Sequence, residues 1–162
     1  GVDAAIEKGK TVFPRDPDGD PILFDYQVKG FFKDSCAALR KVSGTKCSKI
    51  KAYKKEIDGL LFVSPRMIPF NRSGPVGECQ RPLRASTPMG ERVALAHSET
   101  VPAGTTIEFE IHAFTDEMAA LARECLDYGV FRGLGQWRNS GKGRFEWEEI
   151  KPKKRRGADG LE

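Results

Sequence analysis

The chain has 162 residues, a formal net charge of +4 and four cysteines. This length suits one domain with its own hydrophobic core, and so mild a charge does not by itself select a partner. We recognise neither an apolar stretch of membrane-spanning length nor a secretory signal, so we expect a cytoplasmic protein with reduced thiols and no membrane partner. Cys36 and Cys125 are interpreted as small buried hydrophobic residues, with a zinc site as the alternative.

Both ends are expected to lie outside the folded domain. Residues 14–21 are rich in proline, aspartate and glycine, which favour turns over helix, so residues 1–20 are predicted to form a separate N-terminal arm. Residues 151–162 form a basic tail, and the final Leu161-Glu162 is typical of a vector-derived end. We therefore expect one folded domain over residues 21–150.

The first half of this domain is predicted to be a β-α-β unit followed by an irregular insertion. Residues 22–26 predict a short strand, and apolar residues at helical spacing predict a helix over 28–42. Residues 60–63 form a β-prone apolar run that predicts the second strand. Residues 65–88 carry Pro, Gly, Ser and Asn without periodicity, which predicts a long loop.

The second half is predicted to contain two strands, a helix and a closing strand. Residues 93–100 and 106–114 are separated by a Pro-Ala-Gly turn and are expected to pair as a hairpin. Thr115 is predicted to cap a helix that reaches residue 127. Alternation over residues 145–150 predicts the last strand. The order is close to the ferredoxin-like or RRM-like β-α-β-β-α-β antiparallel sheet, with an irregular insertion and one extra strand.

Lysines cluster between residues 46 and 55, a stretch that contains no acid. Such a cluster matches a polyanion partner, and the tyrosine within it can stack on a base. The alternative is a solvated lysine face with the tyrosine anchored to the core. The nucleic-acid-binding candidates here are Lys46, Lys49, Lys51, Tyr53, Lys54 and Lys55.

A glycine-rich stretch spans residues 133–145. Its glycines permit positive φ and close approach to a ligand, its cations can bind phosphates, and its tryptophan offers a stacking surface. It has neither the Walker order nor the Gly-x-Gly-x-x-Gly order, so we expect no nucleotide cofactor. The alternative is a turn in which the glycines allow close packing and Trp137 covers the core. The binding candidates here are Gly133, Gly135, Trp137, Arg138, Gly141, Lys142, Gly143 and Arg144.

Two segments resemble the RAMP superfamily of CRISPR-associated RNA-binding proteins. The first segment follows the helix over 115–127 and contains Gly133, Gly135 and then Gly141-Lys142-Gly143-Arg144-Phe145. The second segment, residues 28–40, carries a glycine, a lysine and small residues that lead to leucine and arginine. The resemblance implies a ferredoxin-like domain that binds RNA. It also suggests a phage or prophage origin, or a mimic that acts on a nucleoprotein complex. Members that cleave RNA usually place a histidine near the first helix, and residues 28–42 contain none, so the resemblance implies binding rather than cleavage.

The remaining chemistry is sparse. His97 and His112 lie on strands that are predicted to be adjacent, and either is a weak candidate for a general acid or base. The carboxylates of the strands alternate with apolar residues, so they are expected to face solvent, and we predict no metal site.

These features favour a nucleic-acid-binding module, with RNA preferred and no cofactor. The alternative is a protein-interaction or assembly component whose basic surface meets an acidic partner. A weaker alternative is a metal-independent endoribonuclease that uses His97 or His112. The sequence does not specify the oligomeric state.

Overall fold

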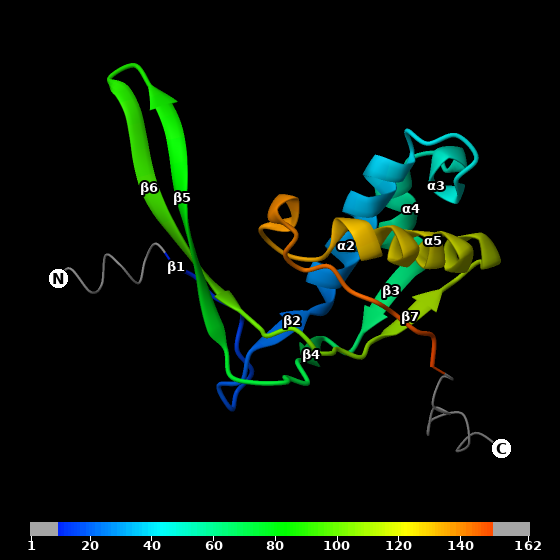
Figure 1. The fold of residues 1–162 in the computed structure, drawn as a ribbon. Helices are drawn as coiled ribbons and strands as arrows, with labels where there is room; N and C mark the ends of the chain where they lie inside the picture. The colour runs from blue at the N-terminus through cyan, green and yellow to red at the C-terminus, as the bar shows by residue number, and fades with distance from the viewer. Residues whose placement is uncertain (1–9, 151–162) are drawn as a thin grey trace. The chain divides into compact units, whose positions relative to one another are not determined.

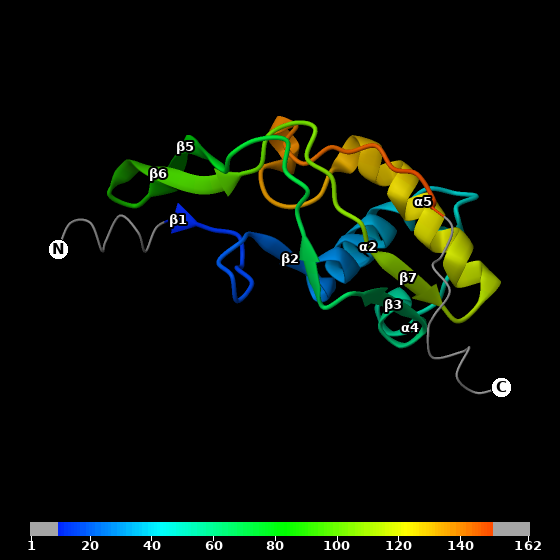
Figure 2. The same ribbon diagram turned by 90° about the horizontal axis from the view of Figure 1, so that it is seen from below.

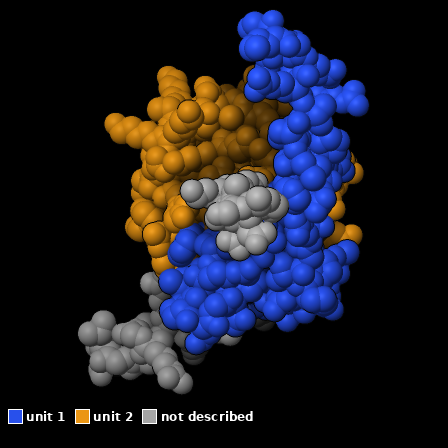
Figure 3. Space-filling view, turned by 90° about the vertical axis from the view of Figure 1, so that its left-hand side faces the viewer, with its two compact units in different colours: residues 1–24, 67–108 blue, residues 25–66, 109–162 orange. Residues whose placement is uncertain are grey.

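The computed structural model describes residues 10–150, and the contacts between residues group them into two compact units (Figure 3). Unit 1 comprises residues 10–24 and 67–108, and unit 2 comprises residues 25–66 and 109–150. The predicted domain over residues 21–150 includes parts of both units, whereas the predicted basic tail over 151–162 lies outside the described residues. Four α-helices and three small sheets are described, so the fold is α+β.

Unit 1 is dominated by a long antiparallel hairpin (Figure 1). Its strands are β5 (Gly77–Thr87) and β6 (Gly90–Thr100), and β1 (Lys10–Thr11) runs parallel to β6 at the base of the hairpin. Strand β1 lies within the predicted N-terminal arm, so ordered structure begins earlier in the chain than the sequence indicated. The backbone N–H of Phe13 also donates to Glu99 on β6, at 2.9 Å, and holds this segment in place.

The predicted loop over residues 65–88 is wrong, because it contains two strands. These are β4 (Met67–Pro69), which pairs with β2 (Ile22–Phe24), and β5. Most residues of β5 are exposed, so the strand has no alternating apolar face that would reveal it. Pro82 is tolerated in it because β5 is an edge strand, where a missing N–H need not break a ladder.

Unit 2 holds the helices. They are α2 (Asp25–Leu39), α3 (Lys46–Lys49), α4 (Tyr53–Leu60) and α5 (Asp116–Arg132). The two strands of this unit, β3 (Leu61–Ser64) and β7 (Glu110–Ala113), pair antiparallel. Helices α2 and α5 contact each other, and they contact β3 and β7 respectively, so both lie on one side of this two-stranded sheet (Figure 2).

The core of unit 2 lies between these helices and the inner face of the strands. Helix α5 presents apolar residues at helical spacing, as predicted, and begins where Thr115 accepts a hydrogen bond from the backbone N–H of Met118 at 3.0 Å. It continues five residues past its predicted end, to Arg132. The largest fully buried side chains of this core are Phe32, Ile57, Leu61, Leu121, Val28, Cys36, Cys47 and Cys125.

The predicted hairpin of residues 93–100 and 106–114 is also wrong. The Pro-Ala-Gly turn does form, since the N–H of Thr105 donates to the carbonyl of Pro102 at 3.2 Å. Thr106 then exchanges backbone hydrogen bonds with Asn71, however, and leads the chain away from β6. As a result β6 pairs with β5, and β7 pairs with β3.

Residues 145–150 form no strand, although their alternation predicts one. The ring of Phe145 instead packs edge-on against Phe31 of α2, with centroids 5.6 Å apart, and the indole of Trp147 donates to Asp127 of α5 at 3.0 Å. The alternation therefore reflects one side of an extended segment that lies against helices. Without this strand, and with β2 pairing only with β4, the strand order does not show a single ferredoxin-like sheet.

Among the described residues, no helix combines the length and apolar character that crossing a membrane would require.

Candidate nucleic-acid interface

The glycine-rich loop folds back on itself directly after α5. The N–H of Leu134 donates to the carbonyl of Gly143 at 2.9 Å and closes the loop at its base. Gly143 has φ +79°, and a Cβ added there would lie 2.0 Å from the carbonyl oxygen of Leu134. Gly133 has the same φ and packs against the backbone of residues 142–144. The closure therefore depends on two glycines, in line with the alternative that the glycines of this loop serve to allow close packing.

The middle of the loop is a single 3-10 turn, Arg138–Ser140, that is built around Trp137. Trp137 adopts a left-handed conformation with φ 61°, and its carbonyl accepts hydrogen bonds from the backbone N–H groups of Ser140 and Lys142 at 3.1 and 3.2 Å. The side chain of Trp137 is half-buried. The ring is thus only partly available as a stacking surface.

Arg138 is held by a carboxylate of helix α2. Its guanidinium lies 2.5 Å from Oδ2 of Asp34, which also accepts from Nε of Arg132 at 3.3 Å. Partial burial acts to raise the pKa of Asp34, but the hydrogen bonds and charges of the two arginines outweigh it and hold the pKa below its usual range. Arg138 therefore anchors the loop to α2, and a phosphate contact by Arg138, which stays a prediction, would compete with this ion pair.

A shallow pocket of about 220 Å³ lies between the loop and the first half of α2. The residues that line it are Gln27, Gly30, Phe31, Asp34, Leu134, Gly135 and Arg138. The glycine-rich loop and α2, 104 positions apart at Asp34 and Arg138, thus meet at this pocket. Asp34 and Arg138 are the charged groups among these lining residues, and Arg132 shares the carboxylate of Asp34 with Arg138.

Lys142 and Arg144 differ from Arg138. Both side chains are exposed, and neither forms a hydrogen bond or an ion pair with another side chain among residues 10–150. They follow the 3-10 turn and flank Gly143 at the closure of the loop. These two cations are therefore the part of the loop that can bind phosphate.

The lysine cluster lies on α3, α4 and the short connection between them. All five lysines are exposed, and within the described part of the chain none of their side chains forms an ion pair. The local fold positions them because Glu124 of α5 accepts from the N–H groups of Lys46 and Cys47, at 2.8 and 3.1 Å, and so fixes the start of α3. The exposure of all five lysines is compatible both with the predicted polyanion contact and with the alternative of a solvated lysine face.

Tyr53 is half-buried at the start of α4 rather than open to solvent. The guanidinium of Arg40 lies 4.7 Å from the centroid of its ring. One face of the tyrosine is therefore covered by a cation of this chain, so stacking on a base would require Arg40 to move.

The lysine cluster and the loop cations lie at different ends of unit 2. Helix α3 contacts α5 at Glu124, whereas the loop begins after Arg132, about 12 Å further along the helix axis at 1.5 Å per residue. Figure 1 shows the loop at the C-terminal end of α5. A single polyanion has to span the surface between them if it is to contact both.

The two histidines lie on strands that do not pair, and they belong to different units, which corrects the prediction that they are adjacent. His97 bonds Glu78 through Nδ1 at 2.8 Å. Nε2 of His112 lies 3.0 Å from Oγ of Ser64 and 3.5 Å from the carboxylate of Glu110. A serine relay needs the acid on one ring nitrogen and the hydroxyl on the other, so this arrangement does not activate Ser64.

Three cysteines are buried together where α2, α3 and α5 meet. Sγ of Cys47 lies 3.8 Å from Sγ of Cys125, and Cys36 is equally buried. Thiol hydrogen bonding and burial raise the pKa of both Cys36 and Cys47 far above the usual range, so these thiols stay protonated. No group of three or more metal-ligating side chains is found among the described residues.

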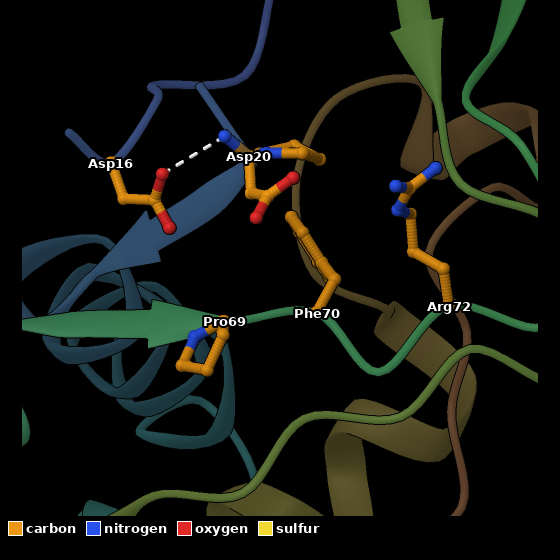
Figure 4. Close-up of a pocket in the computed structure, with 6 residues that line it drawn as sticks. Asp16, Asp20, Pro69, Phe70 and Arg72 are labelled. Atoms are coloured by element: carbon orange, nitrogen blue, oxygen red, sulfur yellow. Dashed lines mark hydrogen bonds between the residues drawn. The ribbon is translucent and has the colours of Figure 1, made fainter. Parts of the chain in front are cut away.

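A second pocket of about 260 Å³ lies in unit 1 and is lined by Asp16, Asp20, Pro21, Pro69, Phe70 and Arg72. Figure 4 shows the carboxylate of Asp16 turned toward the backbone of Asp20, whose N–H donates to it at 2.9 Å. The backbone N–H of Asp18 donates to the same oxygen. The carboxylate of Asp16 thus stabilises its own turn, as the turn-forming composition of this segment predicts.

Comparison with known proteins gives no relative. No protein-family model matches the chain, and no curated protein or solved structure is similar to it. The candidate interface is therefore defined by the contacts, burial and charge described above.

Three residues that shape the interface were not predicted from the sequence. Asp34 and Glu124 are the carboxylates that position Arg138 and the start of α3, and Arg40 covers Tyr53. Asp34 and Arg138 are 104 positions apart, and Lys46 and Glu124 are 78 apart. No local pattern in one sequence links residues at such separations, so only the folded chain reveals these pairs.

Proposed function

We propose that this chain is a nucleic-acid-binding module and that its ligand is single-stranded RNA. The observation that carries the proposal is the exposed lysine cluster on α3 and α4, in which no side chain is paired with an acid among the described residues. Exposed, unpaired cations on a fixed framework attract a polyanion and bind its phosphates. Phosphate contacts of this kind position a nucleic acid without reading its sequence.

The glycine-rich loop adds a second set of contacts to this proposal. Lys142 and Arg144 provide two further cations, and the neighbouring pocket between α2 and Gly135 offers a surface for a base or sugar. Because Arg138 is bound to Asp34, its part in the proposal is to hold the loop and not to contact phosphate.

The finer fold assignment, a ferredoxin-like frame similar to that of the RAMP superfamily, is part of the same proposal. Its support is that α2 and α5 pack together on one side of the antiparallel β3–β7 pair, with the glycine-rich loop directly after α5. The frame would require residues 145–150 to join the sheet. An experimental structure of the protein with RNA bound would test this directly.

The binding test is an electrophoretic mobility shift with labelled single-stranded RNA, single-stranded DNA and duplex at two salt concentrations. Replacing Lys49, Lys54 and Lys55 with glutamine should weaken binding and lower the slope of log affinity against log salt, by about one unit for each phosphate that the variant no longer binds. The matched control replaces three cations that are paired with carboxylates, and it removes the same net charge; these are Lys10, Arg84 and Arg123.

The proposal is wrong if the protein shifts none of the three probes at the lower salt concentration, or if the two triple variants behave alike. Cleaved probe in the same gel would instead indicate the endoribonuclease alternative.

One observation favours the second candidate function, an assembly component. The β5–β6 hairpin exposes four large apolar side chains: Leu83 at 49%, Met89 at 87%, Val93 at 64% and Leu95 at 54%. Val93 and Leu95 share one face of the ribbon, whereas Leu83 lies on the other face and Met89 in the turn. Adjacent exposed apolar side chains such as Val93 and Leu95 are typical of a surface that contacts another protein. Light scattering of the purified protein should then show self-association that Leu95→Ser and Val93→Ser reduce together.

A further inference from the structure

The outer face of the β3–β7 sheet carries two exposed phenylalanines. Residues of β3 alternate, so Leu61 and Val63 are buried in the core and Phe62 points the other way. Phe62 lies opposite His112 of β7, and Phe114 follows two positions later, where its N–H donates to the carbonyl of Leu60 at 3.0 Å. Alternation therefore places both rings on the same outer face.

The two rings touch and remain open to solvent. Their centroids lie 5.7 Å apart at an interplanar angle of 75°, an edge-to-face contact. Phe62 is 42% exposed and Phe114 is 70% exposed. Adjacent exposed apolar side chains are typical of interaction surfaces, so the pair is a candidate contact surface.

The charge around the rings is suited to a phosphate-bearing partner. Nζ of Lys29 lies 4.5 Å from the centroid of Phe62 and donates to the carbonyl of Asp58 at 2.9 Å, while the carboxylate of Asp58 pairs with Lys33. The ammonium of Lys29 covers one face of Phe62, as Arg40 covers Tyr53, so Phe114 is the ring that is open to stacking. An ammonium group has three donors, so Lys29 keeps two for a ligand. Helix α4, which carries the unpaired Lys54 and Lys55, leads directly into β3.

Glu110 lies on the same face as the rings. It is four positions before Phe114, about 13 Å along an extended strand, but only two positions before His112, which lies opposite Phe62, and its carboxylate is 3.5 Å from Nε2 of His112. Asp116 and Glu117 lie in the first turn of α5, where the positive end of the helix offsets their charge.

We propose that Phe114, packed against Phe62, forms a stacking platform for an unpaired base of a single-stranded nucleic acid, with Lys29 binding the adjacent phosphate. This rests on the proposed function and deepens it, because it assigns base contacts to a face distinct from the lysine cluster and from the glycine-rich loop. Every base presents a flat π-face, so the platform accepts single strands of any sequence. A duplex hides these faces and is not a ligand for it.

The test is the fluorescence anisotropy of a labelled oligouridylate of about 12 nucleotides, a length within the usual range of single-strand sites. Replacing both phenylalanines with alanine should weaken binding by about 10-fold or more, since each base stacked on an aromatic ring contributes about 5- to 150-fold. An abasic oligonucleotide of the same length and charge should bind the variant and the parent equally. The salt dependence should not change, because every phosphate keeps its cation.

Two control variants make the result specific. Phe131→Ala removes another phenylalanine, 77% exposed on α5, and should leave binding unchanged. Phe62→Tyr combined with Phe114→Tyr keeps both rings and should retain the affinity of the parent. Phe114→Ala alone removes a ring that lies outside the strands, and it gives a second measurement if the double alanine variant does not fold.

The inference is overturned if the double alanine variant binds oligouridylate as tightly as Phe131→Ala does, or if it loses the same affinity for the abasic strand. It is also overturned if the variant changes only the self-association of the protein, which would identify a protein contact. When the parent binds but the platform variants do not differ from it, the proposed function survives. When the parent binds no single strand, both fail.

Discussion

Among single Gly→Ala substitutions in the glycine-rich loop, Gly143→Ala should destabilise the protein most. Gly143 has φ +79°, where a residue with a Cβ costs about 1–2 kcal/mol. The new Cβ would also lie 2.0 Å from the carbonyl oxygen of Leu134, so the loop has to open at its base. Opening breaks the 2.9 Å hydrogen bond from Leu134 to Gly143, which contributes about 1 kcal/mol. The expected loss is about 2–3 kcal/mol.

Gly135→Ala is the matched control. Gly135 has φ +90°, but a Cβ added there meets nothing within 4 Å. The conformational cost is therefore similar, while the collision and the broken hydrogen bond are absent. Both substitutions also restrict the unfolded chain in the same way, so this contribution cancels in the comparison.

The assay is urea unfolding of the two variants and the parent, followed by tryptophan fluorescence. Gly143→Ala should lower the free energy of unfolding by about 1 kcal/mol or more beyond Gly135→Ala. Equal losses for the two variants would refute the closure of the loop through residues 134 and 143. The same pair of variants compared for RNA binding then shows whether a closed loop is needed for function.

Further predictions concern the residues that hold the loop and the C-terminal segment against the helices. Arg138→Ala should lower the free energy of unfolding by about 1–2 kcal/mol because Asp34 loses a partner, whereas Lys142→Ala should change it by less than about 0.5 kcal/mol; denaturant titration of both tests this. The pKa of Asp34 in the folded protein lies below that of an aspartate in the unfolded chain, so the stability that Asp34 contributes is complete above the unfolded pKa and is lost as the pH falls through the folded pKa. Asp34→Asn should remove this acid-dependent loss of stability, measured as the free energy of unfolding against pH. If the variant and the parent give parallel pH profiles, the prediction is contradicted. Trp147→Phe should cost about 1 kcal/mol because the hydrogen bond to Asp127 is removed, measured as a lower thermal midpoint, and no change would show that the segment does not rest on α5.

Short-range patterns in the sequence were sufficient for several elements. Helix α5 was predicted because its cap and its apolar spacing lie within a dozen residues of one another, and its N-terminus at Thr115 is confirmed. The strand predicted over 60–63 is found one residue later, as β3, and its existence and the burial of Cys36 and Cys125 followed from similarly local signals. The exposure of the lysine cluster was also predictable, because five lysines in ten residues without an acid rarely enter a core.

Strand pairing was decided only by the tertiary structure. The alternation of residues 106–114 was real, but a turn at Pro102 does not determine which strand lies beside β7. Strand β5 escaped detection because its side chains are exposed on both faces and its pairing with β6 depends on backbone hydrogen bonds, which any sequence can form. Residues 145–150 are the reverse case, because they alternate without forming a strand: their apolar side chains contact helices.

The same distinction separates the parts of the candidate interface. The cations of the loop and of the lysine cluster are visible in the sequence, yet Arg138 is neutralised by a carboxylate 104 positions away and Tyr53 is covered by Arg40. Phe62 and Phe114 are 52 positions apart and meet only because β3 and β7 pair. Local sequence determines which side chains are charged or aromatic and how each element begins and ends. Which of them remain free to meet a ligand depends on contacts between distant residues, and these exist only once the chain has folded.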